Sequence, residues 1–405
     1  MRAETDRPLA GAGRPLSVAG VALALTALAL GGFGIGTTEF VTMGLLPQIA
    51  EGVDVSIPTA GHVITAYALG VVVGAPLIAT LCARLPRKGL LVALMAVFAL
   101  GNAAAALAAG MGTLTAARFL SGVPHGAYFG ISALVAASLV RPSRRGRAVG
   151  SVMMGLSVAQ VVGVPVATWL GQVLGWRSAY WFVTAIAILT MASVLRLVPH
   201  QESRGDATVR RELTALRRPQ VIFALLIGTV GFGGMFAMYS YIAPTITEVG
   251  GMSDRVVPIF LALYGVGSVT GAVIGGHAAD RAVLRSLGAS LLSMAALLAL
   301  FTMTISEPVL AGATLFLIAL SASSLVIGLQ IRLMDAAREA QTLGAALNHS
   351  SLNIANALGA WLGGVVIQMG LGYRAASWVG VVLALLGLAI LAIAVRTERR
   401  GQQGR

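Results

Sequence analysis

Long runs of apolar residues recur along the chain, and they restrict the possible fold more than any other feature of the sequence. The first run begins near Ser17 and extends beyond Phe40. Each run has roughly 20 residues or more, the length that an α-helix needs to cross the hydrocarbon core of a bilayer. Charged residues are about 25% of a typical soluble domain, but they are only 11% of this chain. The sequence therefore predicts an all-α polytopic membrane protein.

Twelve apolar runs can be assigned as transmembrane helices. Their expected ranges are 17–46, 58–82, 90–110, 113–139, 148–172, 178–198, 220–246, 255–279, 286–305, 308–333, 342–369 and 374–395. The first run is too long for the apolar part of a secretory signal and lacks an obvious cleavage site, so we expect it to remain as the first span. An even number of spans places both ends of the chain on the same side of the membrane.

Positive charge is concentrated on that same side. The chain has 28 Lys and Arg, and all of them lie in the termini or in the loops on the terminal side, except Arg118, Arg177, Arg255 and Arg374. Loops rich in Lys and Arg stay in the cytoplasm, so both termini are expected to be cytoplasmic. The net charge of +13 is therefore an orientation signal that also suits contact with membrane lipid. It does not indicate binding to nucleic acid.

The two halves of the chain resemble each other. A shift of 197 residues aligns Gly70 with Gly267, Gly74 with Gly271, Arg84 with Arg281, and Pro47 with Pro244. Two six-helix halves in the same orientation are the parallel repeats of one large class of transporters. The expected organisation is an N-terminal tail, a six-helix bundle, a central loop, a second six-helix bundle and a C-terminal tail, at 1–16, 17–198, 199–219, 220–395 and 396–405.

Four segments of the first half carry a resemblance to a known family. They read GTTEFVTMGLLPQIA, YALGVVVGAPL, ARFLSGVPHGAYFG and GVPVATWLGQVLGWR. They resemble helix signatures of the major facilitator superfamily, and the resemblance covers nearly the whole chain. Within it, the chain is most similar to the twelve-span drug:proton antiporters, in the bacterial chloramphenicol-resistance and arabinose-efflux subgroup.

The resemblance implies a fold and a function. It implies twelve helices in two pseudo-repeat bundles and a multi-pass transporter of the bacterial inner membrane that functions as a monomer. Such a protein would export small, mostly lipophilic drugs or metabolites, chloramphenicol-like antibiotics among them, by alternating access. It would need no cofactor, because the proton gradient supplies the energy.

The family's cytoplasmic gate motif is present only in part. The segment ATLCARLPRK has Ala83 where the family has an aspartate and Pro86 in place of its second glycine. The corresponding segment of the second half, GHAADR, keeps the acid. The resemblance implies a cytoplasmic gate formed by Arg84, Arg87, Lys88, Asp280 and Arg281.

Small residues recur at every fourth position in several spans. Positions four apart share a helix face, and small side chains on that face allow two backbones to approach closely. A sliding interface and static packing would give the same pattern. The resemblance implies that spans 5 and 8, and spans 2 and 11, meet across the two halves. A bundle interface is therefore expected at Gly70, Gly74, Gly155, Gly163, Pro165, Gly267, Gly271 and Gly275.

Two ionisable side chains, Glu39 and Arg118, lie well inside predicted spans. Charge at membrane depth is costly, so such a residue is a functional-site hypothesis by default. At the equivalent positions the second half has Phe236 and Leu315, which favours chemistry in the first half and apolar substrate contacts in the second. We expect Glu39 to be a proton-coupling or substrate-contact carboxylate, and Arg118 matches a family arginine linked to proton transfer. For Glu39, a structural salt bridge or a position facing water near the outer end of the span is the alternative.

Weaker candidates lie near this pair. His125 is seven residues after Arg118 on the same helix face and could relay a proton, although a packing role is also open. Span 11 has a polar stripe, and span 7 has adaptable apolar side chains suited to hydrophobic ligands. The expected substrate-cavity residues, with ordinary packing as the alternative for each, are Met235, Met238, Tyr239, Tyr241, His349, Asn353 and Asn356.

Other classes of protein fit the sequence less well. An intramembrane enzyme would need a nucleophile with its base, paired carboxylates or metal ligands at depth, and none of these patterns is present, so we expect no catalytic residues and no metal. A channel would show a filter or rings of charge. Sugar efflux of the arabinose type and a facilitative or proton-coupled importer both stay open, because no residue identifies the substrate.

Overall fold

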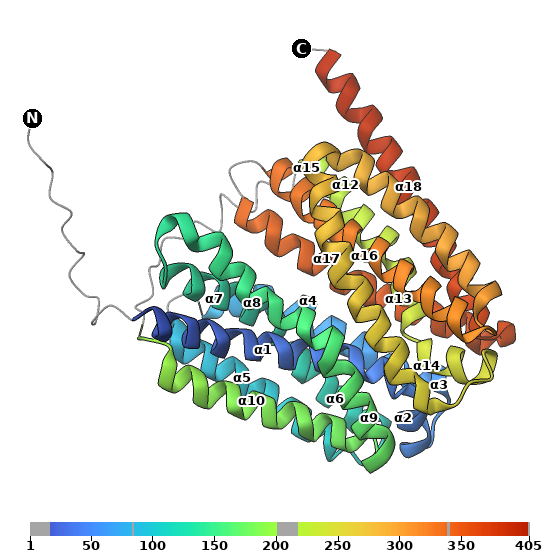
Figure 1. Cartoon of the computed structure of the whole chain (residues 1–405), viewed down its shortest axis with the longest axis horizontal. Helices are drawn as coiled ribbons and strands as arrows, with labels where there is room; N and C mark the ends of the chain where they lie inside the picture. Colours follow the sequence, from blue (N-terminus) through green and yellow to red (C-terminus); the bar gives the residue numbers. More distant parts are fainter. Residues whose placement is uncertain (1–16, 83–84, 201–217, 338–340, 404–405) are drawn as a thin grey trace, which may run out of the picture.

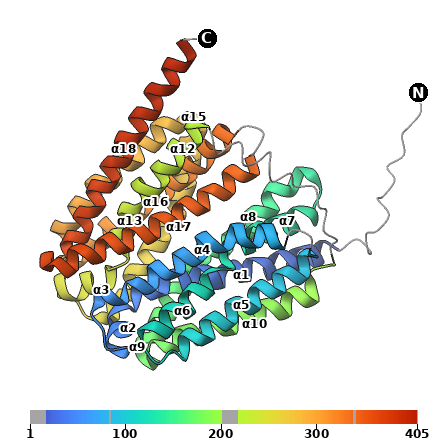
Figure 2. The ribbon, with the colours of Figure 1, turned by 180° about the vertical axis from the view of Figure 1, so that it is seen from behind.

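The computed structural model describes residues 17–82, 85–200, 218–337 and 341–403. The predicted tail 1–16 and most of the predicted loop 199–219 lie outside these residues. The described part contains no β-strand, and its long apolar helices confirm the all-α prediction. Figures 1 and 2 show two groups of helices, one from each half of the chain, that lean against each other.

The helices of the first half form six spans that alternate in direction. They are α1 (Val18–Gly44), α2 (Leu46–Gly52), α3 (Ile57–Ala60), α4 (His62–Leu81), α5 (Arg87–Ala106), α6 (Met111–Gly122), α7 (His125–Ser138), α8 (Arg145–Val158), α9 (Val164–Leu174) and α10 (Arg177–Leu197). The hydroxyl of Ser17 accepts a hydrogen bond from the Gly20 amide and so caps α1. α6 and α7 together form one span, and so do α8 and α9, which a π-helical turn (Ala159–Gly163) joins.

The second half follows the same plan with longer elements. They are α12 (Pro219–Leu226), α13 (Phe232–Tyr239), α14 (Ile242–Pro244), α15 (Val257–Thr304), α16 (Pro308–Ala337), α17 (Gln341–Val366) and α18 (Tyr373–Gln403). α15 has 48 residues, about 72 Å at 1.5 Å per residue, which is far more than one crossing of a bilayer needs. Its backbone leaves the helical conformation at Ala282 (φ −163°, ψ 86°), so α15 contains two of the twelve predicted spans.

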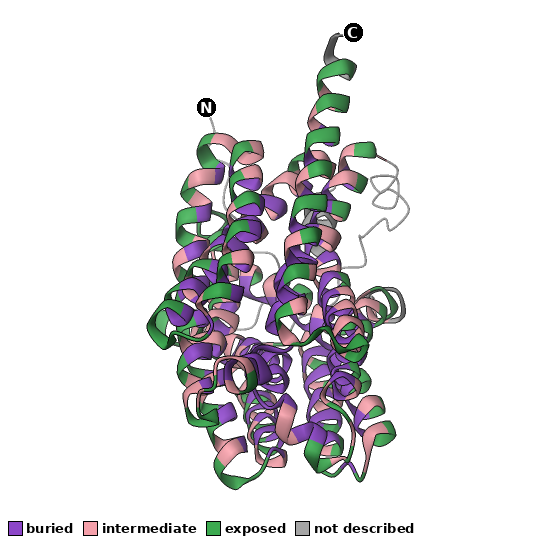
Figure 3. Cartoon of the chain, turned by 90° about the vertical axis from the view of Figure 1, so that its right-hand side faces the viewer, coloured by how far each residue is buried: buried purple, intermediate pink, exposed green. Residues whose placement is uncertain are grey.

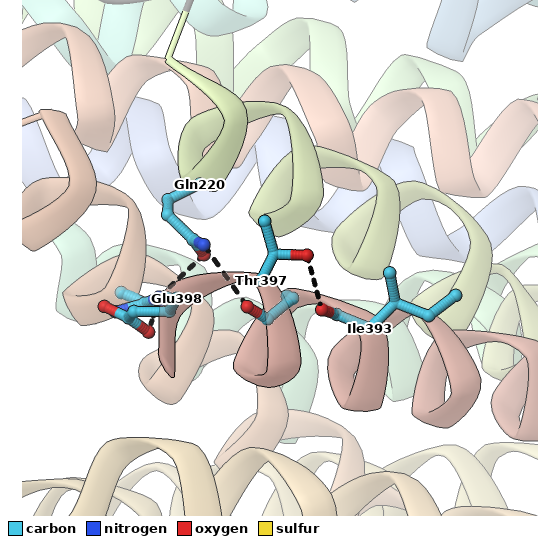
Figure 4. Close-up of polar contacts among 6 residues, drawn as sticks. Gln220, Ile393, Thr397 and Glu398 are labelled. Carbon is cyan, nitrogen blue, oxygen red and sulfur yellow. Dashed lines mark hydrogen bonds and ion pairs between the residues drawn. The ribbon is translucent and has the colours of Figure 1, made fainter. Parts of the chain in front are cut away.

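The start of α1 and the end of α18 lie at one end of the molecule, and α5, α8 and α12 also begin there. Lys88 and Arg145 lie in the first turns of α5 and α8, and Arg218 directly precedes α12, so we call it the basic end. The predicted C-terminal tail begins at residue 396, but α18 continues as a helix through Gln403. Here Arg332 of α16 donates to Gln220 of α12 at 2.9 Å and pairs with Glu398 of α18 at 2.7 Å. These contacts, drawn in Figure 4, tie three helices together at the basic end.

The halves share a hydrophobic core at the end opposite the basic end. One cluster of buried residues includes Phe40, Leu45 and Ile64 from the first half and Tyr241 and Phe260 from the second. The part of the first half nearer the basic end has its own separate cluster. Buried residues fill the interior of the helix packing, and exposed residues face outward (Figure 3). The two halves are therefore packed most continuously at the opposite end.

The predicted interface glycines lie inside the bundles and not between them. A Cβ on Gly70 or Gly74 would meet the backbone of α6 or of Val123, the residue after α6, and one on Gly155 would meet the backbone of α1. Gly163 faces side chains of α1, and Gly267, Gly271 and Gly275 of α15 face α16. Pro165 starts α9. The four-residue spacing correctly indicated close backbones, but it could not indicate which helix comes close.

Gly265 of α15 lies against the backbone of the first half. The sequence did not predict this glycine as an interface residue. α15 contacts the π-helical turn of the first half and α9 beyond it. A Cβ on Gly265 would meet the carbonyl oxygen of Gln160 and would lie 2.7 Å from the amide nitrogen of Val161. Backbone atoms cannot rotate away as a side-chain end can, so the halves would have to separate.

We expect Gly265→Val to destabilise the packing of the two halves by about 1–3 kcal/mol, the usual cost of overpacking. The measurement is the Tm of the purified protein in detergent. Gly276→Val is the matched control, because Gly276 lies on the same helix and a Cβ there would meet nothing within 4 Å. Equal melting temperatures for the two variants would contradict this contact between the halves.

Candidate functional site

Glu39 lies on α1 and is buried near the meeting of the two halves. Its side chain is 7% exposed. Two groups act most directly on its carboxylate: the charge of Arg118 on α6 and the side-chain amide of Asn356 on α17. Tyr67 on α4 and Tyr264 on α15 are also within electrostatic range. The carboxylate is therefore surrounded by groups from both halves.

Arg118 is the largest fully buried side chain of the described part, with an exposure of 0%. Its guanidinium donates from Nη1 to Thr38 Oγ1 at 2.9 Å and from Nη2 to the Thr38 carbonyl oxygen at 3.1 Å. The guanidinium carbon lies 4.4 Å from the ring centroid of Tyr67 and 5.5 Å from that of Tyr180. Such a flat cation stacks well on aromatic faces. These contacts from three other helices fix its position.

Further hydrogen bonds hold the threonines of α1. Thr38 Oγ1 donates to Asn102 Oδ1 at 2.6 Å, and Asn102 Nδ2 donates to the Phe98 carbonyl oxygen at 2.9 Å. The hydroxyls of Thr42 and Tyr180 lie 3.0 Å apart. A connected network of this kind resists movement of any one member. Arg118 is thus anchored on the residue that directly precedes Glu39.

Glu39 and Arg118 do not form an ion pair. The ion pair that the described residues do form joins Arg332 to Glu398, far from this site. Glu39 and Arg118 therefore interact electrostatically without direct contact. The structure does not show the direct salt bridge that the sequence left open. Arg118 Nε has no hydrogen-bond partner among the described residues.

His125 connects this network toward the second half. Its Nδ1 lies 3.0 Å from the hydroxyl of Tyr67. Its ring packs against that of Phe129, with centroids 5.4 Å apart, and Phe129 stacks on His349 of α17 with centroids 6.1 Å apart and planes 4° from parallel. A line of rings therefore runs from the Arg118 site across to α17, which lies beside α4 in Figure 2.

The polar stripe of α17 is buried beside Glu39. Asn353 and Asn356 are 4% and 1% exposed. Asn353 donates to the His349 carbonyl oxygen at 2.9 Å, but its Oδ1 has no hydrogen-bond partner among the described residues. Buried polar groups are normally paired. The stripe therefore places buried polar groups beside Glu39, one of which, the Asn356 amide, acts on its carboxylate.

The four candidates of the seventh span are all buried in the shared core: Met235, Met238, Tyr239 and Tyr241. Phe40 stacks on Phe236 with centroids 6.4 Å apart, and Tyr239 meets Phe40 edge-on at 5.9 Å. The Tyr241 hydroxyl donates to the Ala360 carbonyl oxygen at 2.9 Å. These buried side chains fill the space between the two halves at the end opposite the basic end.

The predicted gate residues do not form a latch among themselves in the described part of the chain. Arg84 lies outside the described residues. Lys88 donates to the Leu195 carbonyl oxygen at 2.7 Å, which ties α5 to the end of α10. Asp280 and Arg281 are exposed and directly precede the break of α15 at Ala282.

Several residues of the site were not predicted from the sequence. Thr38, Asn102 and Tyr180 form the hydrogen-bond network around Arg118, and Phe40 and Tyr264 lie beside Glu39. A polar residue inside an apolar run, such as Asn102, is the signal that could have found part of this set.

No group of three or more His, Cys, Asp or Glu suited to a metal ion occurs in the described ranges.

Comparison with known proteins gives consistent matches over most of the chain. The Major Facilitator Superfamily profile matches residues 28–346. The inner membrane transport protein YdhP of Escherichia coli (strain K12) is 42% identical over 377 residues, covering 92% of this chain and 96% of YdhP. A chloramphenicol resistance protein of Streptomyces lividans is 34% identical over 263 residues, covering 64% of this chain and 67% of that protein.

A solved structure agrees with the arrangement of the helices. A bacterial homologue of the human lysosomal transporter Spinster, in an inward-facing and unoccupied conformation, covers 94% of this chain and 98% of its own, with a TM-score of 0.77 and 18% identity. At that identity, the match shows a shared fold alone.

Proposed function

The chain belongs to the Major Facilitator Superfamily, as its helix motifs predicted, and from this premise we propose that it exports small, mostly lipophilic compounds in exchange for protons. It is a multi-pass membrane transport protein and not an enzyme. The chloramphenicol resistance relative supports drug-like substrates, so we propose a role in drug efflux and antibiotic resistance.

The placement of Glu39 is the observation that carries the proposal. Burial disfavours a charged carboxylate, whereas a nearby arginine favours it. Arg118 belongs to the same half as Glu39, but Asn356 belongs to the other half. Movement of one half against the other therefore changes what surrounds the carboxylate, and with it the affinity for a proton. Proton uptake from one side and release to the other can then accompany substrate movement.

The arrangement of the core suggests that the structure represents a state of the transport cycle that is closed on the outer side. We place the basic end in the cytoplasm, because loops rich in Lys and Arg stay there. The shared core then closes the outer side. Nearer the cytoplasm, Phe129 and His349 stack across the two halves. Alternating access requires the outer contacts to open as the inner ones tighten.

Sugar efflux is a second candidate. The buried amide groups of Asn353 and Asn356 contain both donors and acceptors, which is the chemistry that recognises hydroxyl groups. A lipophilic drug would use the aromatic side chains beside Glu39 instead. Either substrate fits the same coupling mechanism.

The deciding experiment uses proteoliposomes with a pH-sensitive dye inside, to which amphenicol antibiotics and sugars are added one at a time. A true substrate is expected to cause proton movement that depends on the protein. Movement of a compound without any proton movement would show a facilitator and would overturn the antiport proposal.

A further inference from the structure

An apolar groove runs along the surface of the first half between α1 and α8. Its volume is about 560 Å³, and its walls include Leu25, Ala29 and Phe33 of α1 and Met154 and Val158 of α8. In Figure 1, α1 lies between α8 and α10. The residues of α1 that line the groove run from Ala22 to Phe33, in the part of α1 nearer the basic end. Nearly all of its lining is apolar, so it is suited to a hydrocarbon chain and not to water.

The shape of the groove follows from the small residues of the two helices. A Cβ on Gly155 would meet the Ala29 carbonyl oxygen, so the two backbones touch there and form the floor of the groove. Ala22, which also lines it, is exposed and leaves the end of the groove open. Longer side chains farther along each helix form the walls.

A cluster of positive charge lies at the basic end of the same groove. Arg144, Arg145 and Arg147 are exposed, and none of them is in an ion pair with another described residue. The sequence contains no acidic residue between Asp54 and Glu202, so nothing nearby in the chain neutralises this cluster.

Arg147 is in register with the groove. Ser151, which lines the groove, donates to the Arg147 carbonyl oxygen at 3.0 Å, one helical turn away. Residues four apart share a helix face, so Arg147, Ser151 and Gly155 form one line from the charged end into the apolar part. The groove therefore presents cationic groups at one end and a hydrocarbon-binding surface at the other.

We propose that this groove is a binding site for an anionic phospholipid of the cytoplasmic leaflet, with one acyl chain between α1 and α8 and the phosphate against Arg144, Arg145 and Arg147. The proposal rests on the cytoplasmic placement of the basic end but not on the coupling mechanism. Arginine suits phosphate because its planar fork can donate two hydrogen bonds to it. A neutral lipophilic substrate would gain nothing from the three charges.

The test is a lipid titration of the delipidated full-length protein, read by native mass spectrometry. The probes are phosphatidylglycerol and phosphatidylethanolamine with identical acyl chains. The variant R144Q/R145Q/R147Q is expected to bind phosphatidylglycerol at least tenfold more weakly than wild type, since each basic residue near an anionic surface contributes appreciably. Binding of phosphatidylethanolamine should change little.

Two further variants distinguish lipid binding in the groove from a general attraction of anionic lipid to the arginines of the basic end. R396Q/R399Q/R400Q removes three exposed arginines from α18 at the same end of the protein and is expected to leave the affinity unchanged. Ala22→Trp fills the open end of the groove and is expected to weaken phosphatidylglycerol binding severalfold. An equal loss in both arginine triples, or no effect of Ala22→Trp, would overturn the proposal. Because the readout is binding, the result does not depend on whether the protein is an antiporter.

Discussion

Glu39→Gln is expected to abolish proton-coupled transport and to leave the protein folded. Glutamine has nearly the same shape as glutamate but cannot take up or release a proton. The fold should survive because Glu39 is in no ion pair with a described residue, and Arg118 is held by Thr38 and not by the carboxylate. Removing a buried charge also relieves the cost of its burial.

The measurement is the proteoliposome assay with an internal pH dye, and we expect substrate-driven proton flux to fall at least 100-fold. Glu51→Gln is the matched control, because Glu51 is exposed at the end of α2 and the change of charge is identical. A Tm equal to that of wild type would show that the loss is not caused by unfolding. Proton flux at the wild-type level in Glu39→Gln would exclude Glu39 as the coupling group.

The position equivalent to Glu39 in the second half holds an apolar side chain instead of a carboxylate. The internal repeat aligns Glu39 with Phe236, and Phe236 stacks on Phe40, the residue after Glu39. The same location in the two halves thus supplies a charge on one side and an apolar contact between the halves on the other. A second carboxylate there would remove this stacking and add a second buried charge.

The sequence predicted the burial of the two charges better than their contacts. Glu39 and Arg118 stand out because ionisable groups are rare in apolar spans, and both are buried as expected. Their spacing along two separate helices cannot show that Arg118 turns toward Thr38. Threonine and tyrosine are ordinary residues in transmembrane helices, so Thr38, Tyr67 and Tyr180 gave no signal.

The helix contacts show the same limit. Small residues at every fourth position predict that a backbone comes close, and Gly155 and Gly271 do lie against backbones. The pattern carries no information about the partner, which depends on how helices far apart in the chain are arranged. Gly265, which contacts the other half, is therefore no more conspicuous in the sequence than the glycines packed within a bundle.

Arg118→Lys is expected to impair transport although it keeps the positive charge. Lysine cannot donate to Thr38 Oγ1 and to the Thr38 carbonyl oxygen with the geometry of the guanidinium, and it lacks the flat surface that lies over Tyr67 and Tyr180. A hydrogen bond from a charged group contributes about 1.5–3 kcal/mol. We therefore expect a lower Tm and at least a tenfold loss of proton-coupled flux.

Two comparisons establish how Arg118 acts. Thr38→Val removes the Oγ1 acceptor but leaves Arg118 in place, so it should reproduce part of the loss. If Arg118 acts through the protonation of Glu39, adding Arg118→Lys to Glu39→Gln should not lower any residual uncoupled substrate flux further. A large additional loss in the double variant would instead assign Arg118 to substrate binding. Unchanged Tm and flux in Arg118→Lys alone would show that the bonds to Thr38 do not matter for transport, because a point charge at this position would then be sufficient.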